Sequence, residues 1–286
     1  MLDLISQLIV NSLMLSGLYT IITIGLSLIF VLMGILDFTH GIKILLAGYI
    51  SFWLISWGSH PALALAISVG VMTLIGSALY AGPVKRVSDI HFTTLLVTLG
   101  ISYIIEGLVS IYQPPQTIII AKSVTGLTVP LSIDIAGLKF STALVETFVF
   151  SLSIIVLFQL LLKRTMFGIT LRALVEDKET TSLMGVNPST RLLLSIAIVS
   201  AISGVAGFFY MRSFGGTIGD WTLILGKAFA LTLFVGKTTN LQALFLMALI
   251  LAFTENIIGT LISISVKDIA AVIVIILSLI FKYREV

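Results

Sequence analysis

Residues 8–35 read LIVNSLMLSGLYTIITIGLSLIFVLMGI, a stretch without a single charged side chain. A helix needs about 20 mostly apolar residues to cross the hydrocarbon core of a bilayer. The stretch exceeds this length, so it predicts a transmembrane helix. It also indicates the class of the whole chain, because similar stretches follow it.

The rest of the composition agrees with this class. Of 286 residues 58% are hydrophobic and 10% are charged, and the mean hydropathy is +1.18, whereas soluble domains carry about 25% charged residues. The further apolar runs of spanning length lie near 43–58, 61–81, 92–112, 142–162, 191–211, 221–236, 241–262 and 266–281. They do not resemble the alternating ten-residue segments typical of transmembrane barrels. We therefore expect a single all-α domain over residues 1–286, a polytopic transmembrane helical bundle of about eight to nine spans with discontinuous helices.

Several chemistries are absent from the sequence. The N-terminus, MLDLISQ, lacks the basic region and cleavage site of a secretory signal peptide, so we expect the first span to stay in the protein. The chain has no cysteine, no HExxH motif and no recognisable Ser-His-Asp grouping. Gly236-Lys237-Thr238 is not a phosphate-binding loop, because position 231 is Leu and the neighbourhood is a span. We expect no metal, no cofactor and no enzymatic activity.

The distribution of basic residues predicts the orientation. With residue 1 outside and alternating spans, eleven Lys and Arg residues fall on the cytoplasmic side and four fall outside, while Lys227 lies within a span. The eleven are Lys43, Lys85, Arg86, Lys163, Arg164, Arg172, Lys178, Arg191, Lys237, Lys282 and Arg284, and the four are Lys122, Lys139, Arg212 and Lys267. Cytoplasmic loops collect Lys and Arg, so the 164–190 loop and the C-terminus are predicted to be cytoplasmic.

Residues 164–190 form the one long polar stretch between apolar spans. Arg172 and Glu176 are spaced to pair on one helix face, Gly185 suits a helix stop, and Asn187–Pro188 suits the start of the next helix. A partial apolar stripe is made by Leu171, Leu174, Val175, Leu183 and Met184. The pattern predicts a short cytoplasmic helix, a turn and re-entry into the membrane. It fits either a surface for a soluble partner or a solvated linker.

Short motifs occur in a defined order along nearly the whole chain. They are Gly17-Leu18-Tyr19, Gly25, Asp37-Phe38-Thr39-His40-Gly41, Ala47-Gly48-Tyr49, Phe167-Gly168, Arg172-Ala173, Glu176-Asp177, Gly185-Val186-Asn187, Ser203-Gly204-Val205-Ala206-Gly207, Gly226-Lys227-Ala228-Phe229 and Glu255-Asn256. In this order and spacing they resemble the integral membrane permeases of branched-chain amino acid ABC importers.

The resemblance implies a transport subunit with no chemistry of its own, in a bacterial or archaeal plasma or inner membrane. It implies cytoplasmic ATP-binding subunits that hydrolyse ATP, a second permease subunit, identical or homologous, and an external substrate-binding protein, with no nucleic acid. The polar loop would couple the permease to the ATPases and move it by alternating access between two packings. The coupling residues implied are Phe167, Gly168, Arg172, Ala173, Glu176, Asp177, Gly185 and Asn187.

Departures from the family pattern bear on the substrate. Ile42 and Lys43 stand where an acidic residue usually follows His-Gly, and Asp37 replaces the more common Asn. The segment 236–240 replaces a Gly-rich segment ending in Ser-Ile-Pro-Gly, and 282–286 replaces a Pro-Gly-Leu ending. We expect branched-chain or other hydrophobic amino acids as substrates, with urea or a related amide as the alternative.

An ion-coupled secondary transporter is the alternative from a different class. Such transporters often contain internal repeats, and none is evident in this sequence. A channel would need a repeated filter or a ring-forming polar stretch, which is also absent.

Asp37, His40, Gly41 and Lys43 lie where the first span gives way to the second. Ionisable groups at membrane depth are costly and usually face a cavity or one another, and glycines free backbone groups that can meet a substrate. Asp37, His40 and Gly41 are therefore candidates for a substrate pathway or gate. The alternative is a cytoplasmic turn in which Asp37 caps a helix and Lys43 follows the positive-inside rule.

Lys227 and Glu255 lie deep within the seventh and eighth spans. A pair between them would remove two costly lone charges, and a structural pair is favoured over direct contact with a substrate. Glu106 and Glu146 lie near outer helix ends, where they are expected to reach water or a binding protein.

Two further patterns predict packing. Ser200 with Gly204, and Ser203 with Gly207, give the small-xxx-small spacing that allows close approach of a neighbouring helix, within the bundle or in a dimer. The outer segment 113–139 predicts a hairpin or an irregular cap.

Overall fold

The computed structural model describes residues 2–34, 37–87, 91–113, 116–124, 132–135, 138–236 and 240–261, with single positions 263, 266 and 273. Eight helices in this part of the chain are long and apolar enough to cross a membrane. The predicted all-α polytopic bundle is therefore confirmed. The ninth predicted span, 266–281, and the C-terminal segment lie almost entirely outside the described residues.

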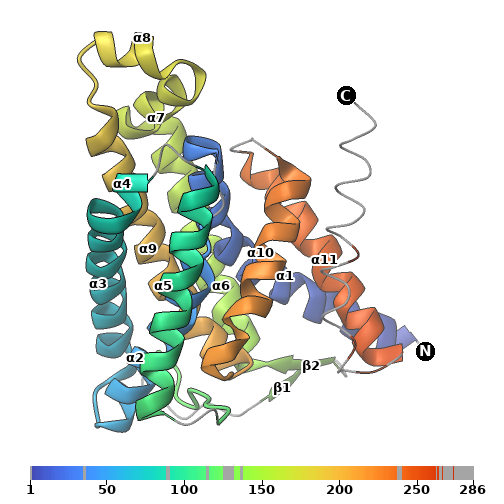
Figure 1. The fold of residues 1–286 in the computed structure, drawn as a ribbon. Coiled ribbons are helices and arrows are strands. Elements are labelled where there is room, and N and C mark those ends of the chain that lie inside the picture. Colours follow the sequence, from blue (N-terminus) through green and yellow to red (C-terminus); the bar gives the residue numbers. More distant parts are fainter. Residues whose placement is uncertain are drawn as a thin grey trace.

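Figure 1 shows the order of the elements along the chain. In chain order they are α1 (Leu2–Met33), α2 (Thr39–Ser56), α3 (Pro61–Leu79), the π-helical turn η1 (Tyr80–Val84), α4 (Lys85–Val87), α5 (His91–Tyr112), β1 (Ser132–Ile135), β2 (Leu138–Ser141), α6 (Thr142–Arg164), α7 (Met166–Glu176), α8 (Lys178–Leu183), α9 (Pro188–Ser213), the 3-10 turn η2 (Ile218–Asp220), α10 (Trp221–Val235) and α11 (Leu241–Leu261).

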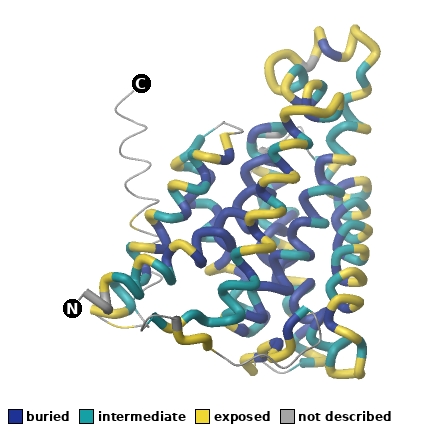
Figure 2. Tube along the Cα trace, turned by 180° about the vertical axis from the view of Figure 1, so that it is seen from behind, coloured by how far each residue is buried: buried dark blue, intermediate teal, exposed yellow. Residues whose placement is uncertain are grey.

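Helix α1 is the central element of the bundle. It contacts α6, α9, α10 and α11. Within its apolar 18-residue stretch 89% is buried, whereas only 22% of the corresponding stretch is buried in each of α3, α5 and α6. Figure 2 shows the same contrast, with buried residues in the interior and exposed ones along the outer helices. The apolar outer faces of α3, α5 and α6 are therefore available to lipid or to another membrane subunit.

Close packing of α9 depends on its small residues. A Cβ on Gly207 would lie 2.0 Å from the carbonyl oxygen of Ile44 in α2, and one on Gly204 would lie 2.7 Å from the Cα of Val69 in α3. Ser200 also approaches α3, because a Cβ on Gly76 would lie 1.9 Å from its Oγ. The predicted small-residue contacts thus lie within the bundle.

The two ends of the bundle differ (Figure 1). Helices α7 and α8 project at one end, which we call the α7–α8 end. The antiparallel hairpin of β1 and β2, with Ser132 opposite Ser141 and Ile135 opposite Leu138, lies at the other, the hairpin end. It provides the hairpin predicted from 113–139, although 114–115, 125–131 and 136–137 lie outside the described residues.

Candidate functional site

The α7–α8 segment is fastened to the bundle at the end of α6. Thr165 caps α7 by accepting a hydrogen bond from the Gly168 amide at 3.3 Å. A Cβ on Gly168 would lie 2.0 Å from the Leu162 carbonyl oxygen, so only glycine allows α7 to cross this close. Arg172 donates from Nη1 to the same carbonyl at 2.6 Å, and a cation is favourable at a helix C-terminus.

The predicted pairing of Arg172 with Glu176 is wrong, because Arg172 turns toward the last carbonyls of α6 and makes no ion pair with Glu176 in the described structure.

The single predicted helix is also divided in two. Asp177 is extended and caps α8, accepting from the Thr180 amide at 3.0 Å. Hydrogen bonds from the Thr180 side chain and amide hold the pKa of Asp177 below its usual value.

The helix boundaries after α8 agree with the sequence. Gly185 has φ +85°, a backbone conformation that favours glycine at a helix end. Asn187 caps α9 by accepting from the Thr190 amide at 3.3 Å, and Pro188 occupies the first position of α9. The predicted turn at Gly185 and the predicted helix start at Asn187–Pro188 are therefore confirmed.

The projecting segment has a buried side and an exposed side. Leu171 is buried, Phe167 packs against the core, and Ala173 is half-buried. Glu176 and Asp177 are exposed, as are the apolar side chains of Met166 (72% exposed), Ile169, Val175, Leu183 (87%) and Met184 (79%). An exposed apolar surface bordered by charges marks a site for another molecule.

A second candidate, the charge cluster at the start of α2, is largely buried, with Lys43 2% and Asp37 13% exposed. Asp37 lies 2.9 Å from Lys43 Nζ and accepts from the Thr39 amide and hydroxyl at 2.8 and 2.6 Å. Burial by itself raises the pKa of Asp37, but Lys43 and the Thr39 hydrogen bond outweigh it, so the net pKa lies below the usual value. Lys43 is only 2% exposed, so it is a buried partner of Asp37; the membrane side that the sequence predicts for it stays a prediction.

His40 and Gly41 extend this cluster toward three other helices. The His40 Nε2 lies 2.6 Å from the carbonyl oxygen of Ile22 in α1, and its Nδ1 lies 3.5 Å from Ser203 Oγ in α9. Gly25 makes room for the imidazole, because its Cβ would lie 2.5 Å from His40 Cε1. A Cβ on Gly41 would lie 2.5 Å from the carbonyl oxygen of Trp221. The structure thus brings α1, α2, α9 and α10 together at these residues.

Lys227 and Glu255 form the predicted ion pair between α10 and α11. Lys227 Nζ lies 3.2 Å from Glu255 Oε1, and the side chains are 13% and 2% exposed. Tyr19 of α1 joins the pair: its hydroxyl donates to Glu255 Oε2 and accepts from Lys227 at 3.2 Å. Lys227 also lies 5.2 Å from the centre of the Tyr19 ring. This buried triad connects three helices.

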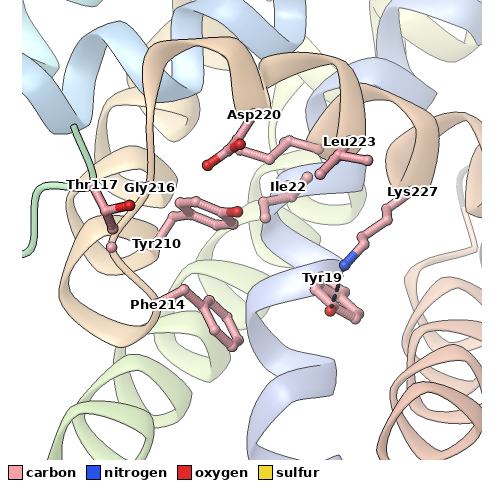
Figure 3. Close-up of a pocket in the computed structure, with 11 residues that line it drawn as sticks. Tyr19, Ile22, Thr117, Tyr210, Phe214, Gly216, Asp220, Leu223 and Lys227 are labelled. Carbon is pink, nitrogen blue, oxygen red and sulfur yellow. Dashed lines mark hydrogen bonds between the residues drawn. The ribbon is translucent and has the colours of Figure 1, made fainter. Parts of the chain in front are cut away.

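A cavity of about 250 Å³ adjoins the triad at the hairpin end (Figure 3). It lies between α1, the end of α9, the connection 214–220 and the first turns of α10. Its wall includes the polar side chains of Tyr19, Tyr210, Asp220 and Lys227. Exposed Thr117 and Phe214 also border it, so the cavity reaches the surface.

The segment 116–124 is held against this side of the cavity. Ile118 and Gly216 form an antiparallel bridge, with Ile118 N to Gly216 O at 3.1 Å and Gly216 N to Ile118 O at 2.9 Å. Arg212 donates to the carbonyls of Ile120 and Ala121 at 3.3 and 3.0 Å.

Glu146 completes the fastening of that segment. Its Oε2 lies 2.8 Å from Arg212 Nε, and its Oε1 accepts from the Ser123 hydroxyl and the Val124 amide at 2.9 and 2.8 Å. The sequence places Arg212 and Glu146 among outward-facing charges; both instead take part in a largely buried network. Glu106 likewise accepts from Trp221 Nε1 at 2.9 Å rather than simply reaching water.

Replacing Glu146 with glutamine should loosen this segment. The change leaves Arg212, which is 5% exposed, without a carboxylate partner, and should lower the free energy of unfolding by about 1–3 kcal/mol. Thermal unfolding and limited proteolysis within 116–124 measure the effect. Asp134→Asn, on the exposed strand β1, is the control; equal sensitivity of the two variants would contradict the fastening role.

Sequence reasoning missed Asp220 and Tyr210. Thr217-Ile218-Gly219-Asp220 fits the capping-box spacing, which could have predicted the η2 turn but not the cavity. Within the described residues, no group of three or more His, Asp or Glu side chains is arranged to hold a metal ion.

Known proteins provide the wider context. The chain is 28% identical to a probable branched-chain amino acid transport permease protein LivH of Methanocaldococcus jannaschii, over 85% of this chain and 78% of that protein. It is 23% identical to the high-affinity branched-chain amino acid transport system permease protein BraD of Pseudomonas aeruginosa, covering 96% and 93%. The relative LivH of Salmonella typhimurium is 21% identical, covering 94% and 91%.

The fold also has a counterpart among solved structures. PsaBC from Streptococcus pneumoniae, solved in complex with Fab, superposes with a TM-score of 0.50 at 13% identity, covering 94% of this chain and 90% of that one. This likeness concerns the fold alone. The model of the branched-chain amino acid transport system permease component matches residues 8–280, and the chain therefore belongs to this family.

Proposed function

We propose that the chain is the permease subunit of an ATP-driven ABC importer that moves branched-chain or other hydrophobic amino acids inward by alternating access. The observation that carries the proposal is the projecting α7–α8 segment. It has an exposed apolar and acidic surface, yet Gly168 and Arg172 hold its base against the end of α6. Membership of the permease family supports the same role.

We assign the α7–α8 end to the cytoplasm. Lys85 and Arg86 of α4, Lys163 and Arg164 of α6, and Arg191 of α9 lie at or next to this end. Lys43, counted as cytoplasmic, and Arg212, counted as external, are both buried. Without them the basic residues number ten on the predicted cytoplasmic side and three on the outer side. The positive-inside bias therefore persists.

In this arrangement separate ATPase subunits bind the α7–α8 segment and hydrolyse the ATP, while this chain supplies none of the catalytic groups. A second permease subunit completes the pathway, and an external binding protein delivers substrate at the hairpin end. A movement of α7 is transmitted to α6 through the hydrogen bond from Arg172 to the Leu162 carbonyl. It is transmitted to the core through the packing of Phe167 and Leu171. The buried groups around His40 and Lys227 lie where α1, α2, α9, α10 and α11 would shift against one another.

Replacing Glu176 and Asp177 together with alanine tests the coupling role. The change removes two exposed carboxylates and the cap of α8. Coupling free energies are typically 1–3 kcal/mol, so we expect substrate uptake per ATP hydrolysed to fall by about 5- to 150-fold. The measurement compares uptake and ATP turnover of the reconstituted complex. Gly70→Ala, on the exposed face of α3 where an added Cβ meets nothing within 4 Å, is the control, and unchanged coupling in the double variant would refute the assignment.

Two further results would favour the alternatives. Uptake driven by a Na⁺ or H⁺ gradient through the purified chain, with no ATPase present, would identify a secondary transporter. Stimulation of ATP turnover by urea or an amide, but by no amino acid, would identify the other substrate class.

A further inference from the structure

A shallow apolar groove lies between α1, α6 and α11 near the α7–α8 end. Exposed Asn240 borders it, so the groove reaches the surface. Its enclosed volume is about 10 Å³, close to the least that holds one water molecule, which is too small for a solute. The apolar side chains that line it include Leu28 and Val31 of α1, Phe158 and Leu162 of α6, and Leu241 and Leu244 of α11.

The helices on both sides of the groove present apolar outer faces. Helix α1 contacts both α6 and α11 and forms the floor of the groove. Val156 and Leu160 of α6, and Leu246 and Ile250 of α11, are each about half exposed. In a membrane such faces meet lipid acyl chains, so a chain that lies against α6 or α11 can also lie along the groove.

Two basic side chains stand at the end of α6, beside the groove. Lys163 and Arg164 are exposed, and neither makes a hydrogen bond or an ion pair within the described residues. Basic residues often bind the last carbonyls of a helix. Here the Thr165 hydroxyl and the Arg172 guanidinium each donate to a carbonyl in the last turn of α6 at 2.6 Å. Both cations are therefore available to an anion from outside the bundle.

The rotation of α6 places Lys163 on the flank that faces away from α9. Phe150 of α6 packs against Phe209 of α9, with the ring centres 4.9 Å apart. Lys163 follows Phe150 by thirteen residues, which at 3.6 residues per turn turns it about 140° away from α9. Leu162, the preceding residue, lines the groove. Lys163 therefore borders the groove and reaches the membrane surface above it.

We propose that this groove binds a phospholipid with an anionic headgroup, from the leaflet at the α7–α8 end. One acyl chain lies along the groove, and the headgroup phosphate binds Lys163 and Arg164. Basic sites between transmembrane helices bind anionic headgroups in this way, and each Lys or Arg near the surface strengthens binding about 5-fold. The site goes beyond the proposed function, since it requires neither an ATPase nor a transported solute.

Lipid titration of the full-length chain, followed by native mass spectrometry, tests the headgroup contact. Dioleoyl phosphatidylglycerol and dioleoyl phosphatidylcholine have the same acyl chains, so their comparison isolates the net charge. We expect the anionic lipid to bind about 30-fold more tightly, the product of two basic residues. Lys163→Gln/Arg164→Gln should bring the two affinities close to equality, and each single variant should lose about 5-fold.

Lys122→Gln/Lys139→Gln is the matched control, because it removes two exposed charges far from the groove, toward the hairpin end. This variant should keep the full preference for phosphatidylglycerol. Excess inorganic phosphate should not displace the lipid, since phosphate has no acyl chain to occupy the groove; displacement would identify a site for free phosphate and overturn the proposal.

Photocrosslinking of the wild-type chain locates the acyl chain without any substitution. Phosphatidylglycerol with a diazirine on one acyl chain should label peptides that contain 24–31, 158–162 or 241–244. The proposal is overturned by equal affinities of wild type for the two lipids, by equal losses in the two double variants, or by labelling confined to α3 and α5. Protection of the groove by a second copy of the chain would also overturn it.

Discussion

Lys227→Met is expected to destabilise the permease more than any other single change considered. The variant leaves Glu255, 2% exposed, without its cation, and removal of one partner from a buried ion pair costs about 3–5 kcal/mol. For a chain of this size that corresponds to a fall in Tm of roughly 6–20 °C. Thermal unfolding in detergent micelles, followed by circular dichroism, measures the fall.

The double variant Lys227→Met/Glu255→Gln separates pairing from other effects. Because it removes both charges, it should recover most of the lost stability. A single variant as stable as wild type, or a double variant no more stable than the single, would contradict the pairing role of the triad.

Gly168→Ala is expected to separate ATP turnover from transport. The new Cβ would lie 2.0 Å from the Leu162 carbonyl oxygen and 2.6 Å from the Leu162 Cα, so α7 must move away from α6. Arg172 would then lose its 2.6 Å hydrogen bond to the same carbonyl. We expect uptake per ATP hydrolysed to fall by about 5- to 150-fold, the range of typical coupling free energies.

Gly70→Ala provides the matched control, because Gly70 lies on the exposed face of α3 and a Cβ there meets nothing within 4 Å. Both variants are compared for ATP turnover, uptake and the yield of assembled complex. Normal uptake per ATP in Gly168→Ala would show that the close crossing of α6 and α7 does not transmit force.

The charged residues show where sequence reasoning reached its limit. The Lys227–Glu255 pair was predictable, because two lone charges in neighbouring spans have few other ways to avoid the cost of burial. The partners of Arg212 and Arg172 were not. Arg212 binds Glu146 and two carbonyls from residues 120 and 121, and those contacts exist only after segments far apart in sequence have packed together.

Local sequence patterns were enough to predict the membrane class, the eight described spans, the caps at Asn187 and Gly185, and the small-residue face of α9. These features depend on local composition and on spacing along one helix. The burial of Lys43, the contact of His40 with Ser203 and the shared cavity of Asp220 and Lys227 could be seen only in the folded bundle. Those features depend on the relative rotation and depth of several helices, which no local pattern specifies.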